Sequence, residues 1–256
     1  MTTASGPTLF ARFAYPPNAL GYCGPDEHRT LLEYAASGVV DGDLRSLAHG
    51  FDGAWPYLEL IAAANGINDP LERRVVEAYW IGSELLEHVP IALLATSLET
   101  RFRGPAGRDW SRLSEVIPAA PLPQHGFHVF AVYPWVGLLR GSDGGEPLHV
   151  LDRCRIRWGR VLEMFGDRAT IRSRPLVWDG RKLALGRPTI ETAVTARDGY
   201  GLTGPLQPGD AVALHWEWVC DRLSLRQLTA LRTVTASHLD LVNRRLSHSP
   251  PQAVLA

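Results

Sequence analysis

The sequence has little that would point to export or to a membrane. Its first seven residues lack the charged region and apolar core of a signal peptide, and no apolar run approaches the roughly eighteen residues of a membrane span. A formal net charge of −1 gives no electrostatic reason to bind nucleic acid or an anionic membrane. The 256 residues therefore predict a soluble cytoplasmic protein, long enough for one large domain or two small ones.

Cysteine is also scarce. The chain has three cysteines, Cys23, Cys154 and Cys220, and an odd number without an export signal argues against a disulfide framework. No two of them form a CxxC metal knuckle. The sequence also contains no GxGxxG and no GxxxxGK[ST] motif, so nothing indicates nucleotide binding. Any functional cysteine should therefore act as a single thiolate, as a nucleophile or a metal ligand.

The patterning changes along the chain and predicts an α+β fold. We expect an all-α helical module over residues 1–102, a linker rich in proline and glycine with one aromatic strand over 103–147, a small OB-like β-barrel with a closing C-terminal helix over 148–246, and a tail over 247–256. Helices are expected at 27–36, 43–50, 55–64, 69–80 and 84–97, with a helical turn at 111–116. Strands are expected at 127–139, 148–156, 158–165, 169–174, 176–178, 182–185 and 211–219. Ser224 and Gln227 form a capping box at the start of the last helix.

Three segments of the second half stand in a distinctive order: a cysteine followed by a glycine and a valine, a glycine–aspartate turn before a hairpin, and a second such turn followed by a strand with a histidine and by a helix. They are Cys154-Arg-Ile-Arg-Trp-Gly159-Arg-Val161, then Gly166-Asp167-Arg-Ala169, and Pro208-Gly209-Asp210-Ala-Val212-Ala-Leu214-His215 with Leu223-Ser224 and a helix that carries Gln227 and Leu231. In these features the C-terminal part resembles the HypC/HupF-type β-barrel chaperones that help assemble nickel–iron hydrogenases. About fifteen residues before the last strand, 186–202, are extra to that pattern, and residues 1–102 match no characterised family.

This resemblance implies a site and a partner. In the family the cysteine and the histidine are implicated in holding an iron that carries diatomic ligands, so Cys154 and His215 would be the metal ligands here, with iron carried transiently. The partner would be a hydrogenase large subunit or another maturation protein. Thiolate and imidazole both suit iron, and we expect the arginines on either side of Cys154 to lower its pKa. The alternative is that Cys154 is a small buried strand residue and His215 a barrel histidine with ordinary hydrogen bonds.

A second candidate lies in the first half. Cys23 stands between two glycines just before an expected helix, where the helix dipole would favour a thiolate, and His28 lies about one turn into that helix. The two residues would form a nucleophile–base pair or two metal ligands. The competing interpretation is a tight turn that happens to contain a cysteine.

The third candidate is His125-Gly-Phe-His128. Two histidines three residues apart can share a metal if the segment is a turn, but they point to opposite faces of an extended strand. His149 could add a third imidazole. Surface or interface histidines are the alternative.

Three functional hypotheses follow. The first is an accessory factor for the maturation of a metalloenzyme, in the first place a nickel–iron hydrogenase. The second is a cysteine- or metal-dependent enzyme centred on Cys23 and His28, or on His125 and His128, with the barrel as a docking domain. The third is a non-catalytic interaction module. The sequence does not decide whether the protein is an enzyme, nor its oligomeric state.

Overall fold

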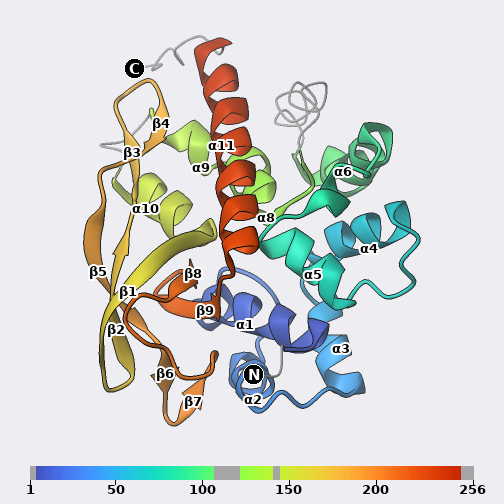
Figure 1. Ribbon diagram of the computed structural model, residues 1–256. Helices are drawn as coiled ribbons and strands as arrows, with labels where there is room; N and C mark the ends of the chain where they lie inside the picture. Colours follow the sequence, from blue (N-terminus) through green and yellow to red (C-terminus); the bar gives the residue numbers. More distant parts are fainter. Residues whose placement is uncertain (1–3, 107–121, 141–144, 249–256) are drawn as a thin grey trace.

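The computed structural model describes residues 4–106, 122–140 and 145–248 (Figure 1). The fold is α+β, as predicted: helices come first, then strands, and one long helix is the last described element. The helical elements are α1 (Gly6–Ala19), α2 (His28–Ser37), α3 (Gly42–His49), α4 (Trp55–Ala64), α5 (Arg73–Trp80), η1 (Glu84–Leu86), α6 (Ile91–Ala106), α8 (His125–Phe127), η3 (His128–Val132), α9 (Trp135–Leu138), α10 (Gly145–Cys154) and α11 (Leu225–His248). The strands are β1 (Arg157–Phe165), β2 (Arg168–Ser173), β3 (Leu176–Trp178), β4 (Leu183–Leu185), β5 (Thr189–Val194), β6 (Ala196–Arg197), β7 (Tyr200–Gly201), β8 (Ala211–His215) and β9 (Trp218–Arg222).

The N-terminal helices form where capping and apolar spacing favour them. The α3 helix begins where the Asp41 side chain accepts a hydrogen bond from the Leu44 amide, and α2 ends at Gly38, whose positive φ of 73° suits a glycine. Helix α1 was not expected from the sequence. It starts at a Ser5 cap and contains Pro16 and Pro17 near its end, two residues that usually end a helix rather than extend it.

Two segments that were expected to be strands are helical. Residues 148–154 form the last part of α10 and residues 155–156 lead into β1, because Pro147, Val150, Leu151 and Cys154 recur at helical spacing and are buried together. Residues 127–139 form the end of α8, the π-helical η3 and α9, and five consecutive residues from Phe127 are buried. Their aromatic and β-branched content favoured a strand, but packing against α11 and α10 decides the structure here.

Five strands close into a barrel in the order β1-β2-β5-β9-β8. All neighbours are antiparallel except β5 and β9, which pair in parallel through Val194 and Trp218. Small and branched side chains fill the interior: Val161, Ala169, Ile171, Ala193, Val212, Leu214 and Val219. At Gly159 a Cβ atom would lie 2.3 Å from the Ile171 side chain, so a glycine is needed where β1 crosses β2. The predicted small barrel is confirmed.

The last part of the barrel differs from the prediction in two ways. The segment 211–219 is two strands joined by a turn at Trp216 and Glu217, so that His215 pairs with Trp218 across a hairpin. The residues 186–202, which seemed extra to the chaperone pattern, supply β5, a full member of the barrel, and the small β6–β7 hairpin.

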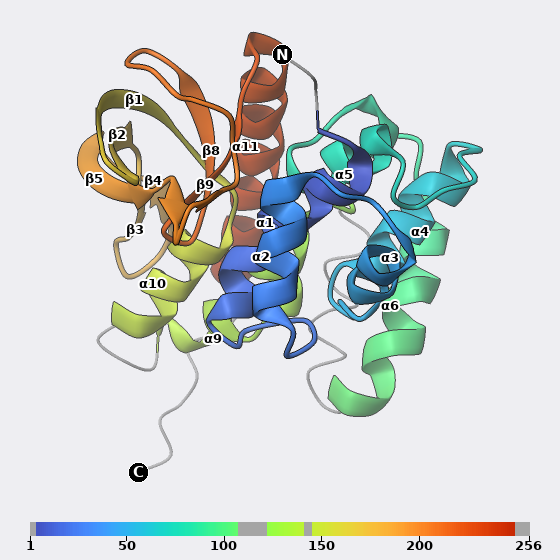
Figure 2. The ribbon, with the colours of Figure 1, turned by 90° about the horizontal axis from the view of Figure 1, so that it is seen from below.

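The long α11 helix runs between the barrel and the N-terminal helices in both views (Figures 1 and 2). Its capping box is confirmed: the Ser224 amide donates to Gln227 Oε1 at 2.9 Å, and the Gln227 amide donates to Ser224 Oγ at 3.2 Å. None of the described helices has the length and apolar character needed to cross a bilayer.

One hydrophobic core joins the helical part to the barrel. It includes Phe10 and Trp80 from the helices and Ala213 and Trp218 from the barrel. The boundaries expected at 102, 147 and 246 stay predictions. The expected turn at 111–116 and nearly all of the tail lie outside the described residues.

Candidate metal centre

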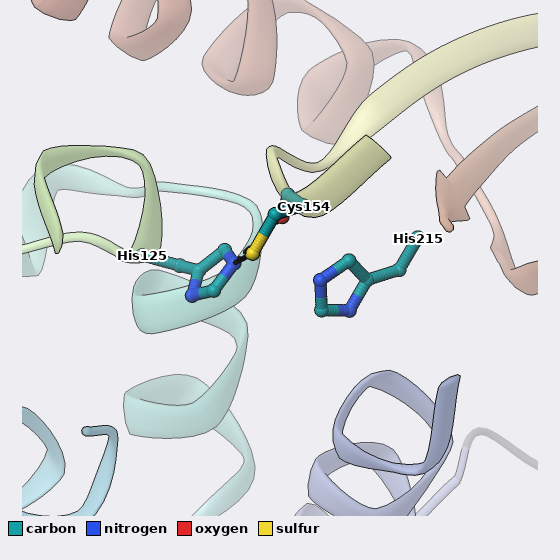
Figure 3. A group of neighbouring side chains, drawn as sticks. All are labelled: His125, Cys154 and His215. Atoms are coloured by element: carbon teal, nitrogen blue, oxygen red, sulfur yellow. Dashed lines mark hydrogen bonds between the residues drawn. The ribbon is translucent and has the colours of Figure 1, made fainter. Parts of the chain in front are cut away.

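Three buried side chains from distant parts of the chain meet at one point. His125 comes from α8, Cys154 from the end of α10, and His215 from the end of β8 (Figure 3). Each offers one ligand atom, and these atoms all lie within 4.8 Å of one another. The group lies where the helical part meets the barrel.

His215 is held in one tautomer. Its Nδ1–H donates a 2.6 Å hydrogen bond to the carbonyl of Phe13 in α1, because a carbonyl can only accept. The other ring nitrogen, Nε2, is buried and has no hydrogen-bond partner, although the Cys154 carbonyl is near enough to affect the ring's pKa. Burial, and next the neighbouring His125, lower the pKa of His215 well below its ordinary value. His215 is thus a neutral imidazole with an unshared lone pair in an enclosed site.

His125 is positioned by both of its nitrogens. Nε2 lies 2.8 Å from the carbonyl oxygen of Cys154 and 3.9 Å from its sulfur, and Nδ1 lies 3.3 Å from the hydroxyl of Tyr79. Burial lowers the pKa of His125 to about 4, despite the opposing effect of the Cys154 carbonyl. A metal at Nε2 would displace the proton shared with that carbonyl. Nδ1–H could then donate to Tyr79, whose hydroxyl lies 3.4 Å from the Gly53 carbonyl.

The Cys154 thiol is not activated by its neighbours. Burial raises its pKa well above the ordinary range. The expectation that the flanking arginines lower this pKa is wrong, because carboxylates hold them: Arg155 pairs with Asp152, and both Arg153 and Arg157 pair with Glu191. Only a bound cation would turn Cys154 into a thiolate at neutral pH.

One thiol and two imidazoles form a nitrogen–sulfur donor set. Such a set suits zinc, iron, cobalt, nickel or copper and does not suit calcium or magnesium, which prefer oxygen. The backbone carbonyl of Phe13 orients His215 in the way that outer-shell acceptors orient metal-binding histidines. The group could bind a transition metal, and three protein ligands would leave at least one coordination position open.

His128 lies outside this group, although it was predicted together with His125. Its Nδ1 lies 3.3 Å from the Tyr57 hydroxyl, and its ring meets the ring of Tyr133 edge to face at 4.6 Å. Burial lowers the pKa of His128 to about 3. His149 is exposed, with its ring 6.4 Å from that of Trp216. The two histidines of the motif therefore have separate surroundings.

Cys23 and His28 are near in sequence, but no hydrogen bond joins them among the contacts of the described residues. His28 is exposed at the first position of α2, five residues after the cysteine. Burial raises the pKa of the partly exposed Cys23 to about 12, which opposes the expected activation of this thiol. A nucleophile–base pair at Cys23 stays a prediction.

Comparison with known proteins places the chain in a family without assigning a function. A family of unknown function, DUF6390, matches residues 2–249. The chain belongs to DUF6390. No curated protein and no solved structure matches it. For this DUF6390 protein, no comparison shows similarity to HypC/HupF-type chaperones, and that resemblance stays a prediction from the sequence motifs.

Three of the four metal ligands proposed from the sequence of this DUF6390 chain come together in the structure. Cys154 and His215 were paired by the resemblance, whereas His125 was assigned to a different site. The roles of Phe13 and Tyr79 were not foreseen. Phe13 acts through its main-chain carbonyl, for which a sequence carries no residue-specific signal.

Proposed function

We propose that this protein is an accessory factor that holds a transition-metal cargo at Cys154, His215 and His125 during the maturation of a metalloenzyme, in the first place a nickel–iron hydrogenase. The observation that carries the proposal is the unpartnered Nε2 of His215, buried beside a thiol and a second imidazole. A buried polar atom without a partner is costly, and a metal ligand is one function that explains it.

The resemblance of the motifs to HypC/HupF-type chaperones supports this metal site and suggests which protein would receive the metal. The cysteine and the histidine that the HypC/HupF pattern selects lie 61 positions apart by residue number, and they nevertheless meet. Cargo that is iron with diatomic ligands would bind to the thiolate and the imidazoles, while the client would be the precursor of the hydrogenase large subunit. The protein's own residues would bind and orient the cargo and exclude water from it.

The first test measures metal in protein purified without oxygen. We expect close to one iron or zinc ion per chain in the unaltered protein, and loss of most of it in Cys154→Ser, His215→Gln and His125→Gln. His128→Gln is the matched control, because it removes an equally buried imidazole outside the group. Retention of metal in all three ligand variants, or equal loss in the control, would contradict the metal site.

The second test addresses the cargo and the client. Diatomic stretching bands in the infrared, together with co-purification of a hydrogenase large-subunit precursor, would support the maturation role. A metal-loaded protein that lacks both and turns over a substrate would instead favour a metal-dependent enzyme, which the open coordination position also allows. Stable binding of a partner without any metal would favour the interaction module.

A further inference from the structure

The two histidines of the candidate metal group are in opposite tautomers. His215 keeps its hydrogen on Nδ1, which donates to the Phe13 carbonyl, so its Nε2 carries a free lone pair. In His125 the nitrogen near the thiol is Nε2, which lies 3.9 Å from the sulfur of Cys154 and 2.8 Å from its carbonyl oxygen (Figure 3). A carbonyl only accepts, so a neutral His125 ring carries its hydrogen on Nε2. A nitrogen that carries a hydrogen cannot bind a metal, so His215 is ready to bind one and His125 is not.

Tyr79 lies at the other nitrogen of the His125 ring. Its hydroxyl oxygen is 3.3 Å from Nδ1 and 3.4 Å from the carbonyl oxygen of Gly53, and its side chain is buried. A hydroxyl both donates and accepts, and its hydrogen rotates between partners. When this hydrogen points to Nδ1, the ring can keep its own hydrogen on Nε2. When it points to Gly53, the hydroxyl oxygen can accept a hydrogen bond from Nδ1–H, so Tyr79 suits both tautomers of His125.

We propose that Tyr79 is a positioning residue that lets His125 switch from a non-binding to a metal-binding tautomer. This inference rests on the metal site proposed above. When a metal binds, the Nε2–H bond of His125 breaks and a metal–Nε2 bond forms. By exchange with water, the ring's one hydrogen moves to Nδ1, where the Tyr79 oxygen accepts its hydrogen bond. The ring stays neutral, so the one net proton that the site releases is that of the Cys154 thiol. His125 is thus the last ligand to join and the first to leave, which suits a carrier that must give up its cargo.

The same pair of side chains occurs a second time, outside the metal group. The hydroxyl of Tyr57 lies 3.3 Å from Nδ1 of His128, and both side chains are buried. The rings of Tyr57 and Tyr79 stack with centroids 5.8 Å apart, so the two tyrosines also share surroundings. Tyr57 is therefore a control matched to Tyr79 in burial and bond length, and it contacts a histidine that is not part of the metal group.

The first test observes the tautomers directly in the unaltered full chain. NMR with ¹⁵N-labelled histidine distinguishes a ring with its hydrogen on Nδ1 from one with its hydrogen on Nε2, and His125→Gln identifies the signals of His125. We expect the hydrogen of His125 on Nε2 in the metal-free protein and on Nδ1 after Zn²⁺ is added, while His215 carries it on Nδ1 in both states. A hydrogen on Nδ1 of His125 before Zn²⁺ is added, or on Nε2 afterwards, would overturn the switch.

The second test measures the affinity for Zn²⁺ by competition with a chelator. Tyr79→Phe removes the hydroxyl and keeps the ring, and we expect it to weaken binding by about 10–100-fold, the size typical of losing an outer-shell partner. Tyr57→Phe should bind Zn²⁺ as tightly as the unaltered protein. In a His125→Gln background, Tyr79→Phe should cause no further loss, because its hydroxyl acts through His125.

The outcomes separate this proposal from the metal site on which it rests. Unchanged affinity in Tyr79→Phe, an equal loss in Tyr57→Phe, or a further loss in the His125→Gln background would overturn the role of Tyr79 and leave the three-residue site standing. Absence of Zn²⁺ binding by the unaltered protein would overturn the metal site, and the switch with it.

Discussion

Acid should destabilise this protein through its buried histidines, and His238 offers the cleanest measurement. His238 lies in α11, is 1% exposed, and donates from Nε2 to the Leu122 carbonyl at 3.2 Å. Its Nδ1 is buried without a partner, beside Gly126. Burial lowers the pKa of His238 to about 4. Protonation at Nδ1 would thus place an uncompensated charge inside the fold.

The sign and the size of the effect on the free energy of unfolding follow from the pKa of His238 in the folded and the unfolded state. The folded pKa is lower than the value of about 6.5 in the unfolded chain, so the unfolded state binds the proton first as pH falls. The stabilisation is complete above about pH 6.5 and is lost as pH falls toward 4. Between pH 7 and pH 5 this one group should cost about 2 kcal/mol of unfolding free energy. His128 adds to the same trend, and the sum is a large part of the roughly 5–15 kcal/mol of a typical domain.

The assay is urea unfolding of the metal-free protein at pH 7 and pH 5, followed by circular dichroism. We expect His238→Gln to lose about 2 kcal/mol less than the unaltered protein between the two pH values, whatever its stability at pH 7. His28→Gln, which removes an exposed imidazole, is the control and should show the full loss. An equal pH dependence in His238→Gln and the unaltered protein would refute the reasoning.

Three further predictions concern stability. Gly159→Ala should lower the free energy of unfolding, measured with a chemical denaturant, by about 1–3 kcal/mol, because the new Cβ would meet the neighbouring strand. Gly137→Ala is the control and should cost far less, because its Cβ would meet nothing within 4 Å. Equal costs would contradict the packing argument. Glu191→Gln should lower the free energy of unfolding by about 3–5 kcal/mol, because Arg157, which is 2% exposed, would keep its charge without a paired carboxylate. An unchanged free energy of unfolding would show that the protein does not need this ion pair. Zinc at a hundred times its dissociation constant should add about 2.7 kcal/mol to the unaltered protein and nothing to Cys154→Ala, as thermal melts would show.

Much of the architecture could be predicted from local signals. The capping box at Ser224, the barrel strands β1, β2 and β8, and four of the N-terminal helices follow from spacing and turn chemistry, whereas β5 was not expected. The failures occur where packing overrides propensity. Residues 127–139 look like a strand by composition, and α1 contains Pro16 and Pro17, yet both segments are helical because their apolar faces are covered by other elements.

The candidate metal site also could not be predicted from local sequence patterns. Cys154, His215 and His125 could each be chosen by residue type and motif, but nothing local indicated that they belong to one site. His125 was grouped with His128 because the two are neighbours in sequence, whereas its partners are contributed by a helix end and a strand end far along the chain. Such a meeting is set by tertiary topology, which the pattern of one segment does not encode.

The hydrogen bond from His215 to the Phe13 carbonyl has a consequence for how the protein can be made and divided. It joins residues 202 positions apart. During synthesis, the imidazole of His215 can therefore be oriented by helix α1 only after β8, the fourth barrel strand in chain order, has emerged. Under the proposed function, the metal would therefore be captured by the finished chain and would not guide its early folding. For the same reason a barrel excised at residue 148 would keep Cys154 and His215 but would lose the Phe13 carbonyl that orients the His215 side chain.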